Sequence, residues 1–281
     1  MTATAPPLPA GLRVYFVGHS FHMFIVRPLI YLAREVGITD HWAEGWDMIG
    51  GSTPSQHWER GGEDNEPKQA LRTGRVQVLT LASNVIVPDP AIDLFADLAL
   101  AHNPDVRVMV QHSWGDASTG AIMQARHGLA PEPAPDAVGT NEDRDRAGPE
   151  ELAALRERMG AQLGRLREQL AGIDERHGRA VTTLVPAGEA VLRLREAVVA
   201  GDVPGVDRQS QLFRDALGHA TQPTMDVVTY LWFAALYDRP VAGLTTLVEP
   251  DDPTSAARQA VLQRVAAETL AEEAAHEAVL D

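Results

Sequence analysis

The sequence predicts an α/β protein built on a parallel sheet. Three runs of β-branched and apolar residues have the length and character of buried strands, at residues 12–17, 76–81 and 106–110. Each run ends in a polar turn, and a segment with helical periodicity separates it from the next run. This alternation of strand and helix is the βαβ pattern of a parallel sheet.

Composition and charge narrow the class of protein. The 281 residues are 44% hydrophobic and 22% charged, as in ordinary soluble globular chains with ample core. The formal net charge of −15 argues against nucleic acid and anionic membrane surfaces as partners. Because there is no cysteine, disulfides, thiolate chemistry and cysteine-based zinc sites are excluded.

The N-terminal segment and the lengths of the apolar runs bear on the location of the protein. Residues 1–11 form a Pro/Ala-rich leader, expected to be flexible, that lacks the basic region and apolar core of a signal peptide. No apolar run approaches the roughly 18 residues that a transmembrane helix requires. We therefore expect a cytoplasmic protein.

The remaining elements follow from periodicity and turn signals. A short second strand is expected at 37–45 and a further buried strand at 180–185, whereas 54–67 is expected to be a polar loop with one helical turn. The expected helices span about 21–36, 91–103, 189–199, 225–237 and 255–280.

Residues 12–281 are expected to form a single domain with an insertion at about 129–177. Its first part, 129–149, is rich in Pro, Asp, Glu and Gly and suits a loop or a lid over a site. Its second part, 150–177, is a long amphipathic helix with leucines at helical spacing. That stripe is either core or the seam of a homodimer.

Ser20 is the first candidate for chemistry. It lies in Gly18-His19-Ser20, at the carboxyl end of the first strand, where Gly18 allows a sharp turn. Open α/β sheets place ligands at this end of their strands. Ser20 is therefore a candidate nucleophile, and the structural alternative is a helix N-cap.

His219 and Asp215 are candidates for the partners of such a nucleophile. A serine that attacks a carbonyl needs a base to take its proton and a third group to orient that base. Asp215 lies four residues before His219, so one loop can present both side chains to a single site. The alternative is a polar loop that contains both residues by chance.

Gly50, Gly51 and Asn84 are candidates for an oxyanion hole. A glycine pair can turn a backbone N–H into a cleft because no side chain blocks the approach. Asn84 follows a buried strand and can offer its side-chain amide. A turn glycine and a capping asparagine are the alternatives.

The order of these segments resembles that of the SGNH (GDSL-like) hydrolases. Gly18-His-Ser-Phe21 is similar to the Gly-Asn-Ser-Phe block of one branch, and Gly50-Gly51-Ser52 with His57-Trp58 resembles its Gly-Gly-Ser and His-Trp pair. The segment from His219 through Tyr237 to Pro240 resembles its tail. The likeness spans about residues 12–245. The sequence departs from the family pattern at three places. His19 stands where Asp or Asn is usual, and the Asn84 block lacks its usual glycine. Asp215 and His219 have the spacing Asp-x-x-x-His, where Asp-x-x-His is usual.

The resemblance implies a three-layer α/β/α fold with a parallel, flavodoxin-like sheet. It also implies Ser20 as nucleophile, His219 as general base and Asp215 as the orienting carboxylate. The implied oxyanion donors are the Ser20 N–H, the N–H of Gly51 or Gly50, and the Asn84 amide.

Five further residues are candidates for substrate contact. His112 follows the third of the three runs and should lie at the same edge of the sheet, and His19 and His57 share that expectation. The alternative for each is a satisfied structural histidine. Trp58 and Trp114 suit the wall of an acyl or sugar pocket, although half-buried tryptophans are common.

These observations favour a serine esterase that cleaves a small ester, such as an O-acyl group on a sugar or another metabolite. An acyltransferase with the same triad, and a catalytically silent binding protein on the same scaffold, remain alternatives. A metal-assisted hydrolase using His19, His22, His57 or His112 lacks the usual ligand spacing. No cofactor or metal is expected, and the expected partner is the small-molecule ester.

Overall fold

Five parallel strands form the centre of the protein. The computed structural model describes residues 9–115, 123, 126–128 and 140–280. The strands are β1 (Arg13–Gly18), β2 (Trp42–Met48), β3 (Val78–Ala82), β4 (Arg107–Gln111) and β5 (Thr182–Val185). They pair in the order β2-β1-β3-β4-β5, all parallel. This is the flavodoxin-like doubly wound order, so the predicted α/β class is confirmed.

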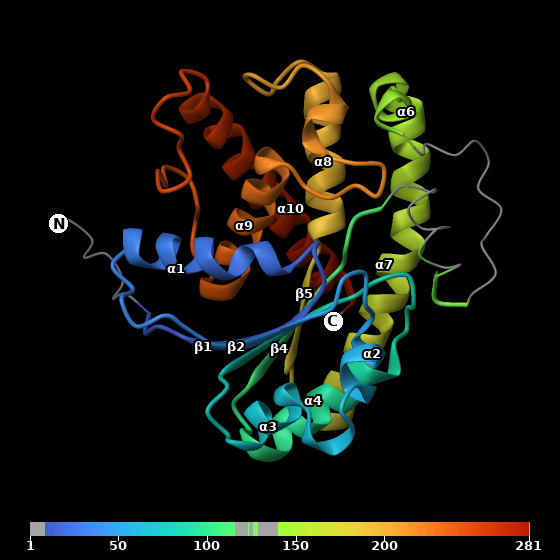
Figure 1. Cartoon of the computed structure of the whole chain (residues 1–281), viewed down its shortest axis with the longest axis vertical. Helices are drawn as coiled ribbons and strands as arrows, with labels where there is room; N and C mark the ends of the chain where they lie inside the picture. Colours follow the sequence, from blue (N-terminus) through green and yellow to red (C-terminus); the bar gives the residue numbers. More distant parts are fainter. Residues whose placement is uncertain (1–8, 116–122, 124–125, 129–139, 281) are drawn as a thin grey trace.

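Helices cover both faces of this sheet (Figure 1). Val14 and Phe16 of β1 point into one core with α1 (Val26–Glu35), α8 (Ala187–Val199), α9 (Gln222–Tyr237) and α10 (Ser255–Leu280). Tyr15 and Val17 point into the other core with α3 (Glu66–Arg72), α4 (Pro90–His102) and most of α7 (Pro149–His177). The alternation of side chains along a strand thus builds the three layers.

Shorter elements complete the chain. They are the helices α2 (Pro54–Glu59) and α6 (Asn141–Arg146) and the 3₁₀ turns η1 (Met23–Ile25), η2 (Gly62–Asp64) and η3 (Gln209–Leu212).

Two expected elements differ from the structure. The second strand begins at Trp42 instead of 37, because Gly37 adopts φ +89° and ends α1 with a bond from the Ile38 N–H to the Ala33 carbonyl. The expected loop at 54–67 contains α2, which starts with Pro54 after a Thr53–Gln56 capping box.

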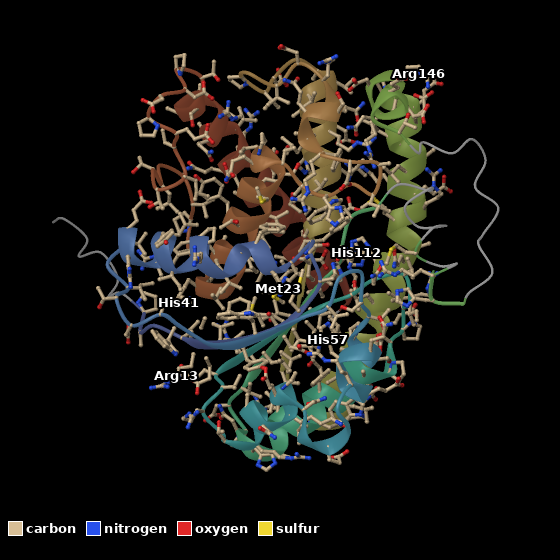
Figure 2. All side chains as sticks on the ribbon, viewed as in Figure 1. Arg13, Met23, His41, His57, His112 and Arg146 are labelled. Atoms are coloured by element: carbon tan, nitrogen blue, oxygen red, sulfur yellow. The ribbon has the colours of Figure 1, made fainter. Side chains whose placement is uncertain are left out.

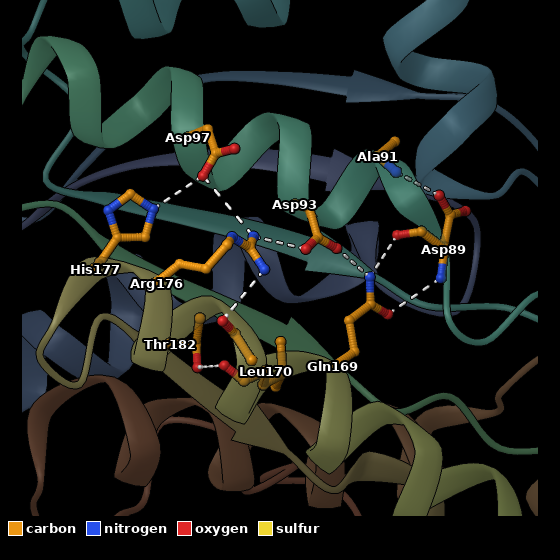
Figure 3. A network of polar contacts seen from close by, with 10 residues as sticks. Asp89, Ala91, Asp93, Asp97, Gln169, Leu170, Arg176, His177 and Thr182 are labelled. Carbon is orange, nitrogen blue, oxygen red and sulfur yellow. Dashed lines mark hydrogen bonds and ion pairs between the residues drawn. The ribbon is translucent and has the colours of Figure 1, made fainter.

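The apolar stripe of α7 belongs to the core of this chain. Its members are buried: Leu152, Leu155, Met159, Leu163, Leu166, Leu170 and Ile173. Polar residues beside the stripe join α7 to α4, where Gln169 and Arg176 bond Asp93 and His177 bonds Asp97 (Figure 3). The alternative of a dimer seam along this stripe is therefore wrong.

Part of the expected leader (1–8) and part of the expected lid (129–139) lie outside the described residues. Across the described ranges, no helix has both the length and the apolar character needed to cross a bilayer.

Buried histidines make stability depend on pH. Burial lowers the pKa of His22 to about 3 and the pKa values of His19, His41 and His112 to about 4. In the unfolded chain the same imidazoles titrate near 6.5. Burial acts oppositely on Asp226, because it raises the pKa of that carboxyl to about 6.

We expect the free energy of unfolding to fall as the pH decreases from about 6.5 to 4. Near pH 5 the unfolded chain binds four more protons on these histidines, and the folded chain binds one more on Asp226. The difference of three protons corresponds to a slope of about 4 kcal/mol per pH unit, and the lowered pKa of the buried His57 adds to it. Urea denaturation at pH 7, 6 and 5 measures this slope.

His112→Leu provides the matched comparison. Neither ring nitrogen of His112 has a hydrogen-bond partner among the described residues, so an apolar side chain of similar size loses no bond there. The slope should fall by about 1.4 kcal/mol per pH unit in this variant. Stability that is flat or rises between pH 7 and 5 in the wild type would contradict the prediction.

Candidate active site

Ser20 lies just beyond the carboxyl end of β1. The N–H groups of His22 and Met23 both donate to the carbonyl of His19 and close the turn that carries Ser20. Gly18 is required for close packing, since an added Cβ would lie 2.8 Å from Cβ of Ala82 on β3. It is not among the residues with positive φ, so the need for glycine here comes from packing and not from the backbone conformation. Ser20 caps neither η1 nor α1.

Ser20, His219 and Asp215 form a continuous hydrogen-bonded chain. The Oγ of Ser20 lies 2.9 Å from Nε2 of His219, and Nδ1 of His219 lies 2.7 Å from Oδ2 of Asp215. The backbone N–H of His219 also donates to Oδ1 of the same carboxylate, at 3.1 Å. Both carboxylate oxygens of Asp215 are thus engaged by His219.

A tight turn accounts for the four-residue offset between Asp215 and His219. The Gly218 N–H donates to the Asp215 carbonyl, and Gly218 adopts φ +83°, a conformation that favours glycine. A bridge between Phe213 and Ala220 closes the base of this turn. His219 therefore folds back over the carboxylate despite the unusual spacing.

The electrostatics of the pair suit an ionised carboxylate. Partial burial alone would raise the pKa of Asp215, but hydrogen bonds from the backbone and ring of His219 outweigh it and lower the pKa below the usual value. An ionised Asp215 accepts from Nδ1–H and leaves Nε2 free to accept from the Ser20 hydroxyl. This is the tautomer that a general base requires.

The Gly50–Gly51 turn lies beyond the end of the neighbouring strand β2. The Ser52 N–H donates to the Ile49 carbonyl at 3.3 Å, and Gly51 adopts φ +66° at the third position of the turn. Among the described residues, the backbone N–H groups of Ser20, Gly50 and Gly51 have no hydrogen-bond acceptor. The expectation that these groups form an oxyanion hole therefore stays open to the chemistry of the site.

Asn84 supports this turn. Its side-chain amide donates to the carbonyls of Ser52 at 2.8 Å and Gly51 at 3.2 Å, and His127 Nε2 lies 3.0 Å from the same Gly51 carbonyl. The Asn84 amide nitrogen is thus directed to two backbone oxygens of the turn. The structure places Asn84 as a support of the glycine turn, which differs from its expected role as an oxyanion donor.

Trp114 contributes to the wall of the site. Its ring stacks on Phe21 at 4.6 Å between centroids, and the Phe21 ring in turn contacts the His219 ring edge-on at 5.2 Å. The indole N–H donates to the Gly218 carbonyl at 2.9 Å. Trp114 is itself buried, and its bond to the Gly218 carbonyl supports the turn that carries His219.

The other four expected contact residues lie inside the protein or pack against neighbouring elements. His19 is buried, with Nε2 at 3.2 Å from the Ser83 carbonyl and Nδ1 accepting from the Phe21 N–H. His57 and His112 are also buried, and Trp58 packs edge-on against Phe95 of α4. Contact of His19, His57, Trp58 and His112 with substrate therefore stays a prediction, and in this structure the three imidazoles are buried.

Arg144 is a site residue that the sequence analysis missed. Its guanidinium donates to the carbonyls of Asp215 and Ala216, each at 2.8 Å, and lies over the ring of Phe213 at 4.7 Å. Arg144 comes from α6 and is buried. Its setting in the charged stretch Asn-Glu-Asp-Arg-Asp-Arg indicates a solvated helix, so no local signal identifies it.

Comparisons with known proteins leave the site to be interpreted from its geometry. No family model matches the chain, and no curated protein sequence matches it. Within the ranges that the structure describes, no three His, Asp or Glu side chains gather as a group able to hold a metal ion.

We expect Arg144→Met to destabilise the protein by about 1–3 kcal/mol, because two carbonyls of the Asp215 turn lose a charged donor. Arg146→Met is the matched control, since Arg146 is exposed at the outer end of α6 and pairs only with Asp143 among the described residues (Figure 2). That variant should change stability by less than about 0.5 kcal/mol. Equal effects in urea denaturation would contradict the role assigned to Arg144.

Proposed function

We propose that this protein is a serine hydrolase of the SGNH type that cleaves a small ester through an acyl-enzyme. The observation that carries the proposal is the hydrogen-bonded chain from Ser20 through His219 to Asp215. The order of nucleophile, base and orienting carboxylate is the one that acyl transfer requires. The resemblance of the surrounding segments to SGNH hydrolases supports the same assignment.

Acylation begins with a proton transfer. Nε2 of His219 takes the proton of the Ser20 hydroxyl while Oγ attacks the carbonyl carbon of the ester. The carbonyl oxygen becomes an oxyanion, which the backbone N–H groups of Ser20, Gly50 and Gly51 stabilise. When the tetrahedral intermediate collapses, the C–O bond to the leaving group breaks and His219 returns the proton to the departing alkoxide. The product is an alcohol and an ester of Ser20.

Deacylation repeats these steps with water. His219 takes a proton from a water molecule that attacks the acyl carbon, and a second oxyanion forms on the same donors. Collapse then releases the carboxylic acid and restores the Ser20 hydroxyl. In both halves Asp215 keeps its negative charge and stabilises the imidazolium.

The class of substrate follows from this chemistry. The site attacks a carbonyl carbon, and the candidate is a small ester such as an O-acyl group on a sugar or another metabolite.

We expect Ser20→Ala to abolish turnover of p-nitrophenyl acetate, because no other group replaces the attacking oxygen. The loss should be on the order of 10⁴-fold or more in kcat. Ser210→Ala is the control, since the Ser210 hydroxyl bonds Asp145 and no member of the triad. A fluorophosphonate probe should label the wild type and the control but not Ser20→Ala. Undiminished turnover in Ser20→Ala would refute the proposed function.

A further inference from the structure

A second Ser–His–Asp set lies beside the first. The Oγ of Ser52 is 2.7 Å from Nε2 of His57, and Nδ1 of His57 is 2.7 Å from Oδ2 of Asp47. The atoms follow the same order as in Ser20, His219 and Asp215. Arg60 forms an ion pair with the other carboxylate oxygen of Asp47.

Burial distinguishes this second set from the first. Ser52 and His57 are each 1% exposed and Asp47 is 4% exposed, whereas the side chain of Asp215 is 42% exposed. Figure 2 shows His57 in the interior of the protein beside the sheet. No substrate reaches the Ser52 hydroxyl, so the set has no direct part in bond cleavage.

Its position connects it to the glycine turn. Ser52 directly follows Gly50–Gly51, Asp47 lies near the end of β2, and His57 lies in α2. The Ser52 side chain is therefore anchored to both elements, while the Asn84 amide holds the carbonyls of Gly51 and Ser52. The turn is therefore fixed by the Ser52 side chain, which bonds His57, and by the carbonyls of Gly51 and Ser52, which accept from Asn84.

The same set is linked to the turn that carries Ser20. The Ile49 N–H donates to the Gly18 carbonyl at 3.1 Å, two residues before Ser20. Burial lowers the pKa of His57, and the Asp47 carboxylate and the Gly18 carbonyl oppose that shift. A neutral His57 donates from Nδ1–H to Asp47 and accepts the Ser52 hydroxyl proton at Nε2, which fixes the direction of that hydroxyl.

We propose that Asp47, His57 and Ser52 act as a positioning relay that holds the Gly50–Gly51 turn so that its N–H groups face the oxyanion formed at Ser20. The inference rests on the proposed function, because it assigns the turn to that reaction. None of the three residues touches the substrate. Their effect is on the placement of donors, and misplacement of such groups by about 1 Å can cost about 10²-fold in rate.

The first measurement is hydrogen–deuterium exchange, which does not depend on activity. In Ser52→Ala, the amides of Ile49 and residue 52, which bond to Gly18 and Ile49, should exchange at least about 10-fold faster. Ser55→Ala is the matched control, because it removes a serine hydroxyl from the same segment that bonds Asp89 instead of the turn. Exchange at these two amides should not change in the control.

The second measurement is the kinetics of p-nitrophenyl acetate hydrolysis. Ser52→Ala should lower kcat by about 10- to 100-fold with KM within about twofold, because the turn acts on the transition state. Phenylboronic acid, which forms a tetrahedral adduct on a catalytic serine, should bind more weakly by a similar factor. If Ser52→Ala does not fold, the same two measurements are made on His57→Gln.

The outcomes separate the two proposals. Unchanged exchange in Ser52→Ala, or faster exchange with unchanged kcat, overturns the relay. Wild-type protein without turnover that depends on Ser20 overturns the proposed function instead. In that case exchange still decides whether the relay holds the turn, since faster exchange supports that role and unchanged exchange removes it.

Discussion

The close packing of β1 against β3 at Gly18 is the constraint on which the site depends. A Cβ at Gly18 would lie 2.8 Å from Cβ of Ala82, so only glycine lets the two strands end side by side. The Gly18 carbonyl then accepts from Ile49 and ties the glycine turn after β2 to the same point. Because parallel strands share one carboxyl edge, the turns after β1, β2 and β3, which carry Ser20, Gly51 and Asn84, all lie at that edge.

Interactions with backbone carbonyls set the shape of this edge. Arg144 holds the carbonyls of Asp215 and Ala216, Trp114 holds that of Gly218, and Asn84 holds those of Gly51 and Ser52. Loops carry more unpaired backbone groups than helices or strands, and a buried carbonyl without a donor costs free energy. Side chains that satisfy these groups therefore fix the loops, which leaves the N–H groups of the glycine turn free for another acceptor.

The sequence predicted the parts of the structure that local patterns encode. Periodicity identified the β1, β3, β4 and β5 strands, and strand-to-turn boundaries indicated Ser20, Gly50–Gly51 and Asn84. Arg144 was missed because its partners in the Asp215 turn are distant in sequence. The Asp47–His57–Ser52 set was missed because the polarity of its segment suggests a loop. Burial of His112 and the inward position of the α7 stripe also depend on tertiary packing, which neither composition nor spacing determines.

The two Ser–His–Asp sets show that geometry alone does not assign chemistry. Their hydrogen-bond distances are nearly the same, at 2.9 and 2.7 Å in one and 2.7 and 2.7 Å in the other. Exposure separates them, because Ser20 is partly exposed and Ser52 is buried. An imidazole between a carboxylate and a hydroxyl fixes the direction of that hydroxyl wherever it occurs. Where a carbonyl carbon can approach, this orientation prepares a nucleophile, and where none can, it gives a rigid anchor for the neighbouring loop.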